Sequence, residues 1–105
     1  MTPNEMELLN KRVLSGDRDS ILEGFLRGGC VTRTNAIIES VKHGYRDKPI
    51  IQQIRRLTTD TTGSFGNEYW RIWHFALAAL DLLGIEPYQG NDRGVKELIE
   101  SKFAF

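Results

Sequence analysis

Few side chains in this sequence are arranged for metal binding. The two histidines, His43 and His74, lie in neither an HxxE nor an HxxxH pattern, and Cys30 has no second cysteine in a CxxC pair. Zinc sites in proteins need three or four such ligands at short, regular spacings. We therefore expect no metal site, and we interpret Cys30 as a small thiol packed between helices.

Groups for covalent or acid–base catalysis are equally sparse. The glycine-rich stretch RGGCVTRT lacks the GxxxxGK[ST] spacing that wraps backbone amides around phosphate, so it is interpreted as a helix end and turn. His74 and Asp81 are two helical turns apart, too far for a direct proton relay in a straight helix. No two carboxylates are recognisably paired. We expect neither an enzyme nor a bound cofactor.

Composition limits the chain to one small domain with a single core. Of its 105 residues, 40% are hydrophobic and 27% are charged, proportions typical of a globular protein. The net charge is zero, so no overall field attracts DNA or anionic lipid, and nucleic acid is an unfavoured partner. The single cysteine, the polar start MTPNEMELLNK and the absence of a long apolar run predict a cytoplasmic protein without a membrane segment.

Helix signals recur along the whole chain. The expected N-caps are Thr2, Asp17, Thr32 or Thr34, Asp47, and Asn91 or Asp92, and the expected helix ends are Gly16, Gly28–Gly29, Gly44 and Gly84. The apolar stripes are Met6, Leu9, Val13 and Leu14; Ile21, Leu22, Phe25 and Leu26; Ala36, Ile37 and Val41; Ile50, Ile51, Ile54 and Leu57; and Val95, Leu98, Ile99 and Phe103. The fifth helix is expected in the stretch from Asn67 to Gly84.

No segment alternates apolar and polar residues with a period of two, so the predicted fold is all-α, with about six helices in three antiparallel hairpins. The single domain 1–105 divides into units of about 3–28, 32–60 and 67–103, with a polar loop at 58–67. One hairpin cannot cover its own apolar face, and three stacked hairpins are about the minimum for a stable stack.

The stretch VTRTNAIIESVKHGYRDKPIIQQIRRLTTD resembles a HEAT repeat of bacterial HEAT-like proteins. The matching positions are Arg33, Ala36, Ile37, Gly44 and 47–50 in this stretch, and Ile72, Ala76, Leu77, Ala79, Leu80, Leu83 and Gly84 in the next unit. Ser40, Trp73 and the long loop depart from the pattern. The resemblance implies a short, right-handed HEAT-like α-solenoid that serves as a protein-binding scaffold.

An aromatic cluster near the start of the fifth helix is the first candidate site. A helical wheel places Trp70, His74 and Leu77 opposite the expected core face, with Trp73 at its border. These side chains could form an anchor patch for a protein, because tryptophan supplies much rigid contact area. Alternatively, they cover the end of the stack beneath the loop, against Phe65. The size of tryptophan favours this packing interpretation.

The outer face of the fourth helix is the second candidate. Gln52, Arg55 and Arg56 lie opposite its isoleucines. In a HEAT-like stack they would line the inner surface, beside Glu23 and Arg27 of the second helix on one side and Glu97 and Glu100 of the last helix on the other. Basic residues prevail in 11–56 and acidic residues in 57–105, so a bipolar groove could orient a charged partner. A solvated face with routine ion pairs is the alternative.

These observations favour a non-enzymatic protein-binding module of HEAT-repeat type. Its partner would be one globular protein or a second copy of the chain, giving a homodimer. Two alternatives remain open: an immunity-type inhibitor of a bacterial toxin, which rests on size and fold analogy, and a nucleic-acid-binding HEAT-like protein.

Overall fold

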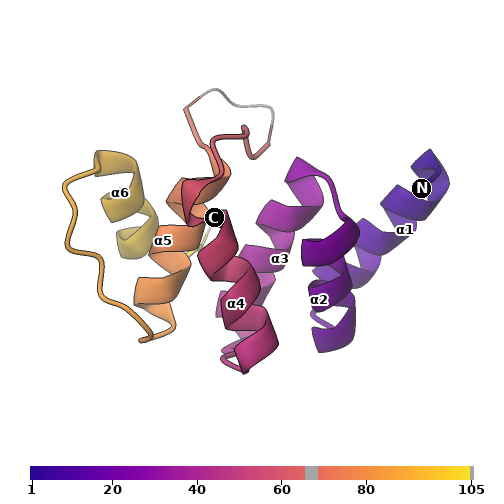
Figure 1. Ribbon diagram of the computed structural model, residues 1–105, viewed down its shortest axis with the longest axis horizontal. Helices are drawn as coiled ribbons and strands as arrows, with labels where there is room; N and C mark the ends of the chain where they lie inside the picture. Colours follow the sequence, from indigo (N-terminus) through magenta and orange to yellow (C-terminus); the bar gives the residue numbers. More distant parts are fainter. Residues whose placement is uncertain (66–68, 105) are drawn as a thin grey trace.

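The computed structural model describes residues 1–65 and 69–104, and within them the chain is all-helical (Figure 1). The helices are α1 (Pro3–Leu14), α2 (Arg18–Arg27), α3 (Cys30–His43), α4 (Lys48–Arg56), α5 (Ile72–Leu82) and α6 (Arg93–Ser101), with a short 3-10 helix, η1 (Leu57–Thr59), after α4. An isolated antiparallel bridge joins Gly63 to Arg71, and the described residues form no strand. The predicted all-α class with six helices is confirmed, whereas the stacking of three hairpins into a right-handed solenoid stays a prediction.

Most helix boundaries follow the local signals. Thr2 and Glu5 form a capping box at α1, Asp17 caps α2 and Asp92 caps α6. The Ser20 hydroxyl and backbone N–H both donate to the Asp17 carboxylate, which lowers the pKa of that group. Beyond α1, α3 and α5, Gly16, Gly44 and Gly84 adopt the positive φ that glycine tolerates best.

Two predicted N-caps behave differently. α3 begins at Cys30 with Gly29 as its N-cap, whereas Thr32 and Thr34 lie buried inside the helix. Asp47 stands at the N-cap position of α4, but its carboxylate makes no capping bond and instead accepts from the Arg18 guanidinium. That contact raises the pKa of Arg18 and ties the start of α2 to the start of α4.

The start of α5 departs furthest from expectation. The helix begins at Ile72, while Trp70 and Arg71 precede it and Asn67 lies outside the described residues. Its first N–H groups are satisfied by backbone carbonyls of the preceding loop: Ile72 donates to Thr62 at 2.9 Å and Trp73 donates to Asp60 at 3.0 Å. The long loop therefore supplies acceptors to the first N–H groups of the helix itself.

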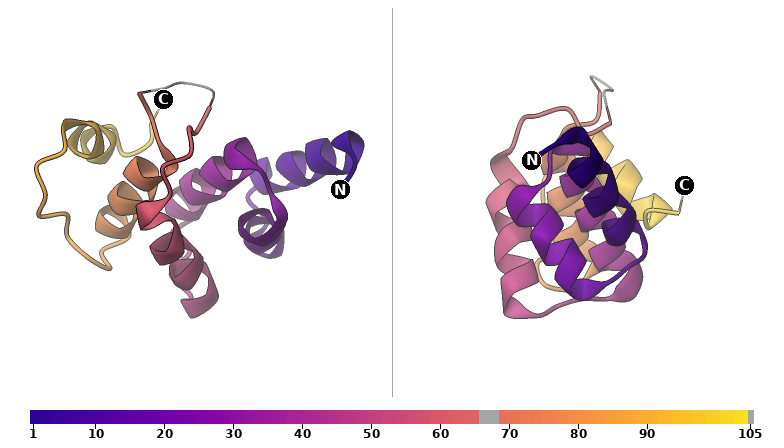
Figure 2. Two further views of the ribbon diagram at one scale, coloured as in Figure 1. Left: turned by 45° about the horizontal axis from the view of Figure 1, so that its top comes forward. Right: turned by 90° about the vertical axis from the view of Figure 1, so that its right-hand side faces the viewer.

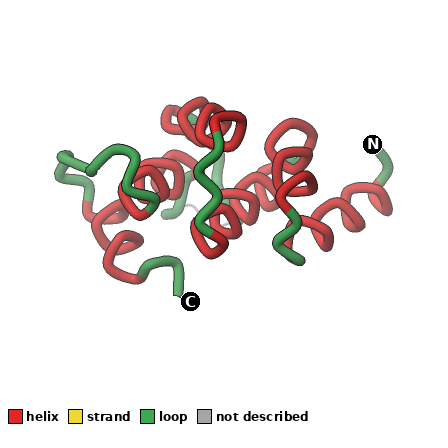
Figure 3. The backbone as a smooth tube through the Cα atoms, turned by 90° about the horizontal axis from the view of Figure 1, so that it is seen from below, coloured by secondary structure: helices red, strands yellow, loops and turns green. Residues whose placement is uncertain are grey.

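The helices pack in layers. α1, α3 and α5 lie side by side along the long axis, and α2 and α4 lie together on one side of them (Figures 1 and 2). α6 packs on α5 from the opposite side, as the view from below shows (Figure 3). The third helix pair thus departs from the arrangement of the first two, and Glu97 and Glu100 of α6 do not lie beside the outer face of α4.

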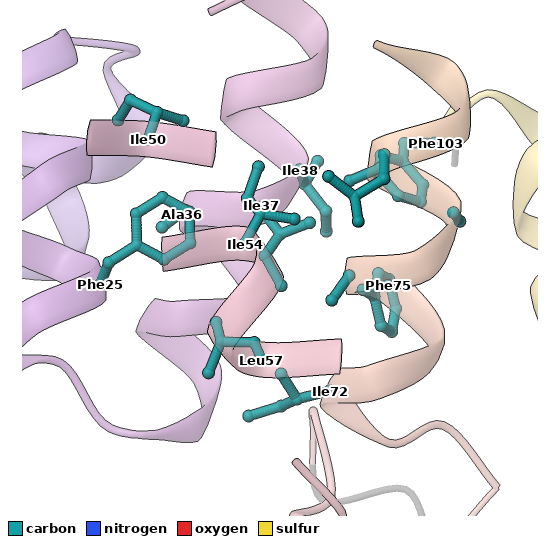
Figure 4. Close-up of a cluster of buried hydrophobic side chains, with 14 of the residues drawn as sticks. Phe25, Ala36, Ile37, Ile38, Ile50, Ile54, Leu57, Ile72, Phe75 and Phe103 are labelled. Carbon is teal, nitrogen blue, oxygen red and sulfur yellow. The ribbon is translucent and has the colours of Figure 1, made fainter. Parts of the chain in front are cut away.

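One apolar cluster connects the helices. Ile37 of α3 and Ile54 of α4 lie between Phe25 of α2 on one side and Phe75 of α5 and Phe103 beyond α6 on the other (Figure 4). All five are buried, so the inward position predicted for Phe103 is confirmed. Burial of such side chains stabilises the fold by roughly 1.5–3 kcal/mol each.

Two leucines of the predicted stripes are not part of this core. Leu14 of α1 is 49% exposed and Leu26 of α2 is 53% exposed. Each sits beside a buried stripe residue, Val13 or Phe25, but lies on the outer flank of its helix, where no neighbouring helix covers it. Among residues 1–65 and 69–104, no helix combines the length and apolar content needed to cross a bilayer.

Candidate interaction surfaces

His74 is buried at the junction of α5 and α6. The residue is only 7% exposed, and its ring stacks on that of Trp73 with centroids 3.8 Å apart. Nδ1 accepts a hydrogen bond from the Arg71 N–H at 3.0 Å, and Nε2 lies 3.5 Å from Oδ1 of Asp92, the cap of α6. His74 therefore joins the starts of two helices and is not available on an open surface.

Trp70 and Trp73 both pack on the buried His74 ring, with ring centroids 5.7 and 3.8 Å from it, whereas Leu77 lies elsewhere. Trp70, which precedes the helix, and Trp73 are half-buried and pack against the core. Leu77 lies beneath the 84–92 loop, where it lines a separate pocket of about 320 Å³ with Pro87 and Tyr88. The structure thus does not gather Trp70, Trp73, His74 and Leu77 into one exposed face, and their part in partner binding stays a prediction.

Trp70 instead lines a pocket between the loop, α5 and α6. We call it the aromatic pocket; its volume is about 470 Å³, and its lining residues are Phe65, Trp70, Phe75, Glu97, Leu98 and Ser101. The Phe65 and Phe75 rings lie 5.9 Å apart at 90°, as an edge-to-face pair. Sequence reasoning placed Phe65 near the tryptophans but did not bring Glu97 to the same site.

The outer face of α4 is exposed at the predicted positions. Gln52, Arg55 and Arg56 all lie in solvent. The Arg55 guanidinium forms an ion pair with Glu86 at 3.2 Å, and both side chains are about half exposed. Such exposed pairs contribute little to stability. The face is accessible, but Arg55 pairs with the loop after α5 and not with α6.

A groove between α1 and α2 is a feature that the sequence analysis did not predict. We call it the amino-terminal groove; its volume is about 480 Å³, and the residues along it include Glu5, Leu8, Lys11, Arg12, Glu23 and Arg27. Leu8 is 58% exposed within it. The signal was present in the sequence, because Leu8 is an apolar residue off the stripe of Leu9 and Val13.

Charges of both signs border this groove. The Arg12 guanidinium spans it to both oxygens of Glu23, at 3.5 and 3.3 Å, and Arg27 approaches the same carboxylate at 3.9 Å. On the α1 side, Lys11 pairs with Glu7 at 3.7 Å. The groove therefore offers an apolar side chain inside a ring of mixed charge.

The described ranges hold no group of three or more histidine, cysteine or acidic side chains that could bind one metal ion. Cys30 is a free thiol, partly buried against the core.

The chain matches no protein-family model, no curated protein and no solved structure. Membership of the HEAT-like family stays a prediction from the motif positions given above.

Proposed function

We propose that this chain is a non-enzymatic protein-binding module of HEAT-repeat type, and that it binds through the amino-terminal groove. The observation that carries the proposal is the concentration of exposed large apolar side chains at this end. Five of the seven lie in the first 31 described residues, namely Met1, Leu8, Leu14, Leu26 and Val31, and two of these, Met1 and Leu8, line the groove. Exposed apolar surface rimmed by polar groups is typical of protein interaction sites.

The repeat interpretation gives a physical reason for this exposure. A terminal helix of a stacked array needs a polar outer face to stay monomeric. α1 is the outermost helix at its end of the molecule, yet Leu8 stands in solvent there (Figure 1). A face of this kind lowers its free energy when a partner covers it.

The partner that the groove fits best is a second copy of the chain. A two-fold interface brings the same patch of each copy together, so the patch must complement itself. The groove meets this condition, because acidic Glu5 and Glu23 lie among basic Lys11, Arg12 and Arg27. A two-fold axis through Leu8 would pair the leucines and set opposite charges across the interface.

Light scattering after size-exclusion chromatography tests the proposal. We expect the molar mass of the wild-type chain to rise with concentration from 12.0 kDa toward twice that value. Leu8→Glu should hold the chain at the monomer mass, because a carboxylate cannot be buried against its own copy without a large desolvation cost.

The matched control is Gln89→Glu, which adds the same charge at an exposed position of the 84–92 loop. It should dimerise like the wild type. A wild-type mass fixed at 12.0 kDa at every concentration would overturn the second copy as partner. Equal loss of dimer in both variants would show that net charge, and not the groove, controls association.

A further inference from the structure

We propose that the aromatic pocket binds an organic cation, specifically a methylated ammonium group. This site lies at the carboxyl-terminal end of the molecule, so the proposal is independent of the amino-terminal groove.

The walls of the pocket are aromatic and inclined to one another. Phe75 forms the common element: the Phe65 ring is perpendicular to it, and the Trp70 ring lies 6.0 Å from it at 62°. Phe75 is only 2% exposed, so it mainly holds the other two rings in place, and the Phe65 and Trp70 rings can present π-electron density to one guest from two directions. A cation within about 6 Å of an aromatic centroid is attracted by the ring quadrupole, most strongly by tryptophan.

The charge at the rim has the sign that a cation requires. Glu97 lines the pocket from α6, and among its described lining residues none carries a positive charge. Arg93 reaches Glu97 from outside at 3.2 Å, but the Arg93 side chain is 87% exposed. A pair this exposed is weak and screened, so Glu97 can turn to a cation in the pocket.

The shortage of hydrogen-bond acceptors selects the kind of cation. Ser101 Oγ already donates to the Leu98 carbonyl at 2.8 Å and accepts from the Phe103 N–H at 3.1 Å. A bare ammonium has three N–H donors to satisfy, and among the described lining residues Glu97 is the one carboxylate. A trimethylammonium group has no N–H donor and loses less hydration, so it suits apolar walls. The volume of about 470 Å³ lies in the range of small-molecule sites.

Isothermal titration calorimetry with choline as the probe tests this proposal. We expect choline to bind the wild-type chain at least about tenfold more tightly than its neutral isostere, in which carbon replaces nitrogen. Ethanolamine, which carries a bare ammonium, should also bind more weakly than choline. Equal affinity for choline and the neutral isostere would overturn the proposal.

Variants at the rim of the pocket test whether the charge of Glu97, and not only the shape of the pocket, contributes to choline affinity. Glu97→Gln should weaken choline binding roughly threefold or more, whereas Arg93→Gln should strengthen it by freeing Glu97. Lys96→Gln is the control, because Lys96 is exposed on the same helix and does not line the pocket. Opposite signs for Glu97 and Arg93 support a cation at the rim, and an unchanged affinity in both would contradict it.

A parallel titration with peptides tests whether the ammonium group belongs to a modified protein or to a free metabolite. A peptide with trimethyl-lysine and the same peptide with unmodified lysine should differ in affinity in the way that choline and ethanolamine differ. Tighter binding of the methylated peptide than of choline would identify a modified protein as the ligand, and the reverse would identify a free metabolite. If neither the methylated peptide nor choline binds, the proposal fails.

Discussion

At the scale of single residues, His74 was predicted to bind a partner, but its ring is buried and contacts polar groups at the starts of α5 and α6. Both of its ring nitrogens face polar groups of the chain, Arg71 N–H on one side and the Asp92 carboxylate on the other. Gly94 lies so close that an added Cβ would sit 2.8 Å from Cδ2 of the ring. The histidine therefore fills a site shaped by both α5 and α6.

His74→Phe should destabilise the fold by about 1–3 kcal/mol, because it keeps the stack on Trp73 but leaves the Arg71 N–H without its acceptor. Urea unfolding followed by circular dichroism measures this change. His43→Phe is the control: His43 is exposed and stacks on Tyr45, so the change should stay within about 0.5 kcal/mol. Similar losses in both variants would mean that the buried contacts of His74 are not the cause.

At the scale of elements, two kinds of contact position the helices: close packing of α2 on its neighbours, and hydrogen bonds from the start of α5 to carbonyls of the preceding loop. Gly24 lets α2 lie against its neighbours: a Cβ there would be 2.7 Å from Cγ2 of Val13 in α1 and 3.3 Å from Cγ2 of Thr32 in α3. The 60–71 loop supplies carbonyls to the start of α5. Both features are contacts between elements, and neither belongs to one helix alone.

Gly24→Ala should destabilise the protein by about 1–3 kcal/mol, although alanine favours an isolated helix by about 1 kcal/mol over glycine. The reason is the overlap with Val13, which forces α1 and α2 apart. A double-mutant cycle in urea unfolding provides the test. On a Val13→Ala background, which removes the overlapping methyl, Gly24→Ala should cost clearly less. Strict additivity would show that the two helices are not in the predicted contact.

At the scale of the whole molecule, one core links two unlike ends. The amino-terminal end exposes Leu8 and a charged groove, whereas Phe103 folds back to pack on Phe75 near the other end with ring centroids 5.7 Å apart. The buried cluster runs between them from α1 to the residues after α6. Figure 4 shows the part of it from Phe25 of α2 to Phe103. A repeat array could unfold one unit at a time, but a continuous core favours one cooperative transition.

Phe25→Ala in α2 tests this coupling. We expect it to lower stability by about 3–5 kcal/mol, because it leaves a large cavity in the core. Both tryptophans, Trp70 and Trp73, lie in the carboxyl-terminal half, so their fluorescence reports on the far end. The fluorescence midpoint in urea should fall together with the circular dichroism midpoint. An unmoved fluorescence transition would reveal two units that unfold independently.

The sequence alone determined the helices whose signals are local. Thr2, Asp17 and Asp92 cap their helices with their own side chains, and Gly16, Gly44 and Gly84 allow the backbone to turn left-handed after a helix. These effects act within about five residues, so spacing is sufficient to predict them.

Only the tertiary structure decided which apolar residues are covered and where the sites form. Periodicity treats Leu26 like Phe25, but a neighbouring helix covers only Phe25. The start of α5 depends on carbonyls from residues 60 and 62, so the wheel that included Trp70 used a helix turn that does not exist. The aromatic pocket needs α6 on the far side of α5, a choice made by the packing of distant residues and carried by no local pattern.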